Sequence, residues 1–150
     1  HMIGHVQRRK ARDVVAQFAP LDSVSLMDLV EALESRGASA DKTLPVLIEV
    51  NVSGEASKSG FTPDAAAKAV EQVRAMSPHL RVEGLMTMAP LVDDAEQTRP
   101  VFAGLRALAE TLELKELSMG MTNDFEVAIE EGATEVRIGS AIFAGLDGEL

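Results

Sequence analysis

The sequence predicts an α/β fold in which short parallel strands alternate with longer helices. Residues 46–52 form a nearly unbroken apolar run rich in β-branched side chains, which is typical of a parallel strand covered on both faces. Between such runs, apolar residues recur at helical spacing. Strict alternation requires parallel strands joined by right-handed crossovers. Two architectures satisfy it, an open doubly wound sheet or part of a (β/α)8 barrel.

Six strands are predicted, and helices separate them along the chain. The strand candidates are residues 2–6, 21–24, 46–52, 82–88, 117–119 and 135–138. The helix signals are Ser25 as a cap with Gly37 as a stop, Thr62-Pro63-Asp64 as a start, Pro100 in a first turn, and Asn123 as a cap with Gly132 as a stop. In the short helix after Asn123, Phe125, Ala128 and Ile129 are expected to face inward. Residues 7–18 fit a further helix.

Composition bounds the class of protein. A chain of 150 residues suits one domain over residues 1–150, and its 46% of apolar residues excludes a disordered chain. The net charge of −10 argues against nucleic acid and anionic membranes as partners. The chain has no cysteine, no apolar run of membrane-spanning length and no signal-peptide pattern. We therefore expect a soluble cytoplasmic protein.

Small polar residues stand where the last two predicted strands end. Both architectures place the ligand site at the C-terminal ends of the strands. Ser118 and Gly120 belong to one strand end, and Gly139 and Ser140 belong to the next. Gly139 lets a ligand approach the backbone closely, and Ser140 offers a hydroxyl and an amide at a helix start. A phosphate site and a pair of tight turns explain these residues about equally well.

Arg137 is the charged residue of the last predicted strand. It stands between Val136 and Ile138, so its side chain points to the opposite face of the sheet from theirs. If that face is a barrel interior, the buried guanidinium needs a partner. If that face lies beneath helices, Arg137 pairs with an acid such as Glu135 or Glu131. The pattern leaves both positions open.

Spacing excludes several common kinds of site. Residues 54–59 lack the second glycine of a phosphate-binding P-loop, and no Gly-x-Ser-x-Gly motif of a hydrolase occurs. The three histidines have no partner at metal-ligand spacing, so no metal site is predicted. The basic run at residues 8–12 is interpreted as a solvated helix face, and a lysine in a polar loop, such as Lys58, is usually a solvated charge.

Six short motifs stand at successive strand ends between residues 3 and 143. They are Ile3-Gly4-His5-Val6-Gln7, Val50-Asn51-Val52-Ser53-Gly54-Glu55, Ser57-Lys58-Ser59-Gly60-Phe61, Gly84-Leu85-Met86-Thr87-Met88, Ser118-Met119-Gly120-Met121-Thr122-Asn123-Asp124-Phe125-Glu126 and Val136-Arg137-Ile138-Gly139-Ser140-Ala141-Ile142-Phe143. In this order they resemble the pyridoxal phosphate homeostasis proteins, a family related in fold to the N-terminal barrel of alanine racemase.

The resemblance implies a partial (β/α)8 TIM barrel of fold type III that binds pyridoxal 5′-phosphate (PLP). It implies that Ser118, Gly139 and Ser140 hold the phosphate. It also implies that Arg137 faces the pyridine nitrogen and leaves it unprotonated. Lys58 would lie near the mouth of the site, and His5, Asn51 and Met86 would line the pocket. Members carry or buffer PLP for vitamin B6 balance, so the resemblance implies a binding protein that is not an enzyme.

Two motifs of that family are absent from the sequence. The family carries its Schiff-base lysine on the first strand, in an Ala-Val-Ser-Lys context, and ends its second strand in Phe-Gly-Glu-Asn. We therefore expect a truncated chain that holds about six of the eight β/α units, strands 3 to 8, and lacks the covalent anchor for PLP. We expect a full-length member to be monomeric, and this chain either to be marginally stable or to pair its exposed sheet edges with a second copy. The alternatives are a fragment of a PLP-dependent racemase-like enzyme and an α/β module without a cofactor.

Overall fold

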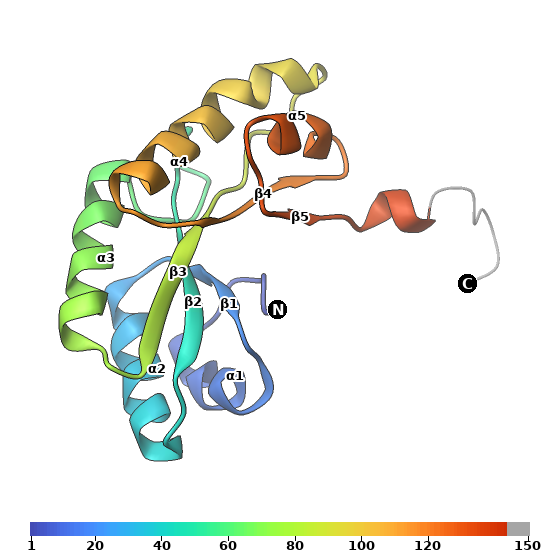
Figure 1. Ribbon diagram of the computed structural model, residues 1–150. Helices are drawn as coiled ribbons and strands as arrows, with labels where there is room; N and C mark the ends of the chain where they lie inside the picture. Colours follow the sequence, from blue (N-terminus) through green and yellow to red (C-terminus); the bar gives the residue numbers. More distant parts are fainter. Residues whose placement is uncertain (144–150) are drawn as a thin grey trace.

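The computed structural model describes residues 1–143 and contains a five-stranded parallel sheet (Figure 1). The strands are β1 (Leu21–Val24), β2 (Leu44–Glu49), β3 (Leu80–Met86), β4 (Glu116–Met121) and β5 (Glu135–Arg137). They are hydrogen-bonded in chain order, from β1 to β5. A doubly wound sheet reverses its strand order at the ligand site, whereas a barrel keeps chain order. The fold is therefore part of a (β/α)8 barrel.

The first predicted strand is reduced to a single bridge. Met2 pairs in parallel with Leu21, and the amide of Asp22 donates to the carbonyl of Met2 at 2.9 Å. The expectation of a strand over residues 2–6 was too long, because Gly4 interrupts the run and Ile3 is 46% exposed. The bridge nevertheless holds His1 beside the N-terminal part of β1.

Helices and short 3-10 turns connect the strands. They are η1 (Arg8–Lys10), α1 (Ala11–Gln17), α2 (Met27–Ala40), α3 (Pro63–Met76), η2 (Ala95–Thr98), α4 (Arg99–Thr111), α5 (Phe125–Glu130) and η3 (Ser140–Phe143). The start of α3 is confirmed, since Thr62 Oγ1 accepts the amide of Ala65 at 3.4 Å. Pro100 lies in the first turn of α4, as predicted. Among the helices of residues 1–143, none combines the length and hydropathy that crossing a bilayer requires.

Both predicted boundaries of α2 were wrong. Its N-cap is Leu26 rather than Ser25, and no side chain caps it. The helix also runs through Gly37 and ends at Asp41, which takes the left-handed conformation with φ of 50°. Gly37 serves packing instead of ending the helix, because a Cβ there would lie 2.8 Å from the Cβ of His79.

The start of α5 also differs from the prediction by one residue. The N-cap is Asp124 rather than Asn123. The Asp124 carboxylate accepts the amide of Met121 at 2.6 Å, which ties the end of β4 to the helix. Ala128 is buried as expected, whereas Ile129 is 53% exposed and does not face inward.

The two faces of the sheet differ in chemistry. The apolar core includes the fully buried Phe102 and Leu105 of α4 and Leu33 of α2, and these helices lie along one side of the strands (Figure 1). On the other side, register aligns a row of residues across four strands. Glu49 pairs with Met86, Met86 with Ser118, and Ser118 with Glu135. Paired residues of parallel strands share a face, so this row marks a polar inner face.

Candidate functional site

Ser118 and Asp22 show that the inner face is concave. The hydroxyl of Ser118 on β4 donates to Asp22 Oδ2 on β1 at 3.1 Å, although β2 and β3 lie between these strands. Such a contact is possible only across the hollow side of a curved sheet. Both side chains are fully buried, with exposed fractions of 0%. The inner face is therefore the interior of the partial barrel.

Arg137 on β5 points into this interior, which settles the choice that the pattern left open. Its Nη1 donates to Ser118 Oγ at 2.8 Å, and its Nη2 donates to the carbonyl of Thr87 at 2.9 Å. Both acceptors are neutral, and the two bonds engage two of the five N–H groups of a guanidinium. Arg137 is thus fixed in orientation by two strands and retains donors for a further partner.

A cavity of about 730 Å³ opens at the C-terminal ends of β3, β4 and β5. Arg137 contributes to its lining, as do the loops that follow these three strands. The lining residues are His1, Ile3, Lys58, Met88 to Val92, Ala95, Met121 to Asp124 and Glu135 to Ser140. Strand C-terminal ends are the usual ligand position in a barrel. The cavity therefore stands where the sequence predicts a site.

The loops after β4 and β5 meet at one end of this cavity. Ser140 Oγ donates to Thr122 Oγ1 at 3.2 Å, and this hydrogen bond joins the two loops. At Gly139, a Cβ would have no atom within 4 Å, and φ is not positive. Neither backbone strain nor packing within residues 1–143 explains the glycine, so the open space beside it suits a ligand. Ser140 is the first residue of the 3-10 turn η3, with which the described part of the chain ends.

The predicted site residues fall into two groups. Lys58, Arg137, Gly139 and Ser140 line the cavity. Met86 and Ser118 lie in the buried inner row instead, where Ser118 supports Arg137. Asn51 organises the loop that carries Lys58, since its Nδ2 donates to the carbonyl of Glu55 at 2.8 Å. His5 is exposed and lies outside the cavity lining.

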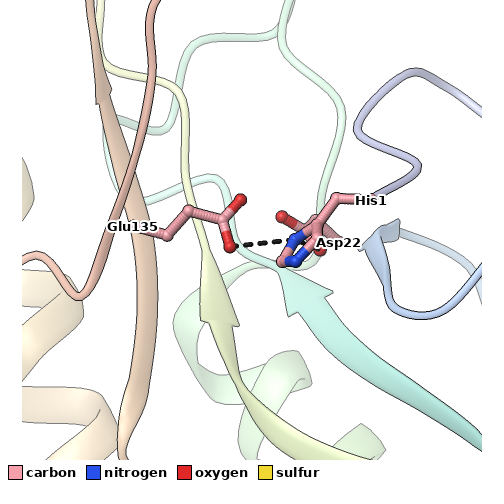
Figure 2. A group of neighbouring side chains, drawn as sticks. All are labelled: His1, Asp22 and Glu135. Atoms are coloured by element: carbon pink, nitrogen blue, oxygen red, sulfur yellow. Dashed lines mark ion pairs between the residues drawn. The ribbon is translucent and has the colours of Figure 1, made fainter.

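Three residues of the inner face were not predicted as site residues. His1 and Glu135 line the cavity, and Asp22 lies behind them. His1 Nδ1 is 2.9 Å from Glu135 Oε2 and 3.4 Å from Asp22 Oδ1 (Figure 2). These residues lie up to 134 positions apart in the sequence, so no local motif joins them. The one local signal was the presence of the acid Asp22 within the otherwise uncharged strand β1.

Burial perturbs the ionisable groups of the inner face. Burial and the neighbouring Asp22 together raise the pKa of Glu135 to about 7, while the charge of Arg137 opposes the change. Burial also raises the pKa of Glu49, against the charges of His5 and Arg137. For Arg137, burial lowers the pKa, and the carboxylates of Asp22 and Glu135 oppose that. The charges of four acids thus act on this guanidinium, those of Asp22, Glu49, Asp124 and Glu135, although none of them forms an ion pair with it among the described residues.

Comparison with known proteins identifies the family. Residues 2–147 match the N-terminal domain of alanine racemase. The chain is 39% identical over 149 residues to the pyridoxal phosphate homeostasis protein of Aquifex aeolicus, covering 95% of this chain and 65% of that protein. It is 30% identical to PipY of Synechococcus elongatus, solved with PLP bound, with a TM-score of 0.85 over 94% of this chain and 68% of PipY.

The fold extends to more distant proteins. Alanine racemase of Clostridium difficile is 13% identical, and its TM-score of 0.78 over 97% of this chain and 39% of that one shows the same fold. The chain spans less than two thirds of the Aquifex protein. The resemblance predicted from the six strand-end motifs is confirmed. The chain belongs to the family of the alanine racemase N-terminal domain, and within it resembles the pyridoxal phosphate homeostasis proteins.

Proposed function

We propose that this chain binds PLP in the cavity and belongs to a cytoplasmic carrier that serves PLP homeostasis without turning over a substrate. The relatives are named for PLP homeostasis, and PipY was solved with PLP bound. The cavity suits a small molecule of that kind. Its volume of about 730 Å³ lies within the range that ligand pockets of folded proteins occupy.

The phosphate is proposed to bind between the loops after β4 and β5. Gly139 leaves open space beside the backbone, and the Ser140 and Thr122 hydroxyls stand at the same place. Hydroxyls and closely approaching backbone amides are typical phosphate partners in barrels. Ser118 as a direct phosphate ligand stays a prediction. Its present bonds to Arg137 and Asp22 support a role in positioning Arg137.

The pyridine ring is proposed to lie over Arg137. When bound, PLP supplies an aldehyde and a ring that can accept electrons, and the protein decides how far that chemistry proceeds. Arg137 has N–H donors and no acceptor, so it suits a ring nitrogen that stays unprotonated. Exposed apolar side chains near it, Ile3, Leu91 and Met121, line the cavity and would cover the ring.

Lys58 is proposed as the residue at the cavity mouth that meets the aldehyde end of PLP. Asn51 Nδ2 lies 3.5 Å from the carbonyl of Lys58 and 2.8 Å from that of Glu55. Gly60 closes the same loop with a positive φ of 111°. The loop therefore has a defined shape while its lysine faces the cavity.

The open space at Gly139 is the observation that carries the proposal, and an absorbance titration tests it. PLP and pyridoxine 5′-phosphate, which lacks the aldehyde, are titrated against the 150-residue chain. We expect both to bind, because docking depends on the phosphate. We expect Gly139→Val to weaken both by about tenfold or more, equivalent to about 1.4 kcal/mol. Borohydride reduction followed by peptide mapping then shows whether PLP reaches Lys58.

Matched variants separate binding from folding. Gly139→Val should leave the midpoint of thermal unfolding unchanged without ligand, because nothing within 4 Å opposes a Cβ there. Ala141→Val adds bulk to the same turn outside the cavity lining and should leave both affinities unchanged. Unchanged affinity in Gly139→Val would contradict the proposed phosphate position. Racemisation of alanine by the PLP-loaded chain would contradict the carrier role.

A further inference from the structure

Three side chains from distant parts of the chain converge on the inner face of the sheet. His1 precedes the bridge at Met2, Asp22 lies on β1, and Glu135 lies on β5; Figure 2 shows their polar ends meeting. One atom of each side chain that could coordinate a metal, a ring nitrogen or a carboxylate oxygen, lies within 4.8 Å of the corresponding atoms of the other two. The cluster stands apart from the proposed phosphate loops and uses none of their residues.

Asp22 supplies a second, independent observation. The residue is completely buried, and its Oδ2 accepts the hydroxyl of Ser118 at 3.1 Å. Its Oδ1 is also buried but has no hydrogen-bond partner among residues 1–143. This oxygen faces His1 Nδ1 at 3.4 Å. A buried carboxylate oxygen without a hydrogen-bond donor is costly, so a cation bound beside it would stabilise it.

Arg137 does not supply that partner. Its two hydrogen bonds go to the hydroxyl of Ser118 and the carbonyl of Thr87. It reaches Asp22 through Ser118, which accepts from Arg137 and donates to Asp22. Carboxylates that bind metal ions are usually held by such hydrogen bonds, because the bond fixes the orientation of the carboxylate.

We propose that His1, Asp22 and Glu135 form a binding site for one divalent transition-metal ion. One imidazole with two carboxylates suits Zn²⁺ and similar ions better than Ca²⁺ or Mg²⁺, which prefer oxygen alone. Two carboxylates also balance the charge of a divalent ion. The three residues are far apart in the sequence and form no local motif. The search for histidines at metal-ligand spacing therefore did not find this site.

The distances agree with a compact metal site. In a tetrahedral Zn²⁺ site with bonds of about 2.0–2.1 Å, neighbouring ligand atoms lie about 3.3 Å apart. His1 Nδ1 lies 2.9 Å from Glu135 Oε2 and 3.4 Å from Asp22 Oδ1. His1 and Glu135 both line the cavity, so a metal can enter from it and keep a fourth position open toward it.

Metal titration of the 150-residue chain without PLP tests the proposal. Zn²⁺ binding is measured by calorimetry, and Co²⁺ binding by its visible absorbance, which reports tetrahedral coordination. We expect one ion per chain. Glu135→Gln should weaken Zn²⁺ binding by more than about tenfold, since it removes a ligand. Asp22→Asn should do the same, and Glu135→Gln decides the matter if the buried Asp22 variant fails to fold.

A second histidine–carboxylate pair provides the matched control. His79 Nδ1 lies 2.7 Å from Glu34 Oε1, in a region away from the cavity lining. His79→Gln should leave Zn²⁺ affinity unchanged. Adding one alanine before His1 removes chelation by the terminal amine but keeps the imidazole, so binding should persist in that variant.

Three results would overturn the metal site. The first is absence of Zn²⁺ binding to the native chain. The second is unchanged affinity in Glu135→Gln, and the third is loss of binding when the alanine is added. The PLP titration is a separate readout, so failure here leaves the proposed PLP function untouched.

Discussion

Two arginines near the end of the sheet are held in opposite ways. Arg99, at the start of α4, contacts the exposed carboxylates of Glu96 at 2.8 Å and Glu130 at 2.6 Å and the largely buried carboxylate of Glu131 at 3.0 Å. The hydrogen bonds that Arg99 donates to these acids raise its pKa. Arg137 instead donates to two neutral oxygens inside the barrel, and burial lowers its pKa.

The difference separates a structural charge from one that is open to a ligand. The carboxylates around Arg99 come from η2 and from the end of α5, so the cluster joins these elements to α4 and leaves Arg99 few donors. Arg137 faces the cavity with donors to spare and with acids nearby that do not contact it directly. An arginine that forms ion pairs with several acids joins the elements that carry them. An arginine that is hydrogen-bonded only to neutral groups still has a positive charge that a ligand can pair with.

Removal of Arg137 should have the largest effect on stability. Arg137→Met leaves Ser118 and the carbonyl of Thr87 without their donor and leaves the inner acids without a cation. A hydrogen bond to a charged group contributes about 1.5–3 kcal/mol, and Arg137 makes two of them. We expect a loss of that size in the free energy of unfolding, measured by urea denaturation. If Arg137→Met lost less free energy of unfolding than Arg99→Met, the surface arginine would be the more important of the two for stability.

Truncation of Ser118 should have the next largest effect. Ser118→Ala removes the hydroxyl that links Arg137 to Asp22 and leaves Asp22 Oδ2 without its donor. A buried acceptor left without a partner costs about 2 kcal/mol. The matched control is Ser39→Ala, because Ser39 is exposed and donates only to the carbonyl of Ser35. Equal losses in both variants, by urea denaturation, would show that the inner hydroxyl has no special role.

Removal of Arg99 should cost less, although it breaks more ion pairs. The side chains of Glu96 and Glu130 are 60% and 63% exposed, so water and salt screen their attraction to Arg99. We expect Arg99→Met to lose less stability than Arg137→Met. The loss should also shrink in high salt, while that of Arg137→Met should not. A salt-independent loss would place Arg99 among the buried charges.

The smallest effect is expected at Glu49, and it depends on pH. Burial raises the folded-state pKa of Glu49, so the folded state holds this proton more tightly than the unfolded chain does. The stability of the native chain therefore falls as pH rises from about 4.3, the unfolded pKa, through the folded pKa. Glu49→Gln should match the native chain in acid and become slightly more stable above this range. Urea denaturation across pH measures the difference, and parallel curves would contradict it.

The sequence predicted the fold well where local patterns carry the information. Five of the six strand candidates became β1 to β5, because apolar β-branched runs need no distant partner to be recognised. Thr62 and Pro100 were also placed correctly, because the signals for a helix start are local in the sequence. Gly37 was not, because its role is set by His79, a neighbour in space and not in sequence. The exact cap of α5 likewise depends on how Asp124 reaches back to Met121.

The site was predictable in its position but not in its inner contacts. Alternation alone indicated that Arg137 faces away from its apolar neighbours, and strand-end logic brought Gly139 and Ser140 to the cavity. The meeting of Asp22 with Ser118 depends on the curvature and register of four strands, which no single segment encodes. The sequence therefore indicated where the cavity lies and missed the acids beside it.

The chain order of the strands has a consequence for synthesis on the ribosome. Each strand pairs with the next one to emerge, so the sheet can extend from β1 onward as the chain lengthens. The hydrogen bond from Ser118 to Asp22 is different, since it closes a separation of 96 residues. Asp22 is made early and must wait for β4, and for Arg137 after it. The polar interior therefore cannot be complete until both β4 and Arg137 have been synthesised.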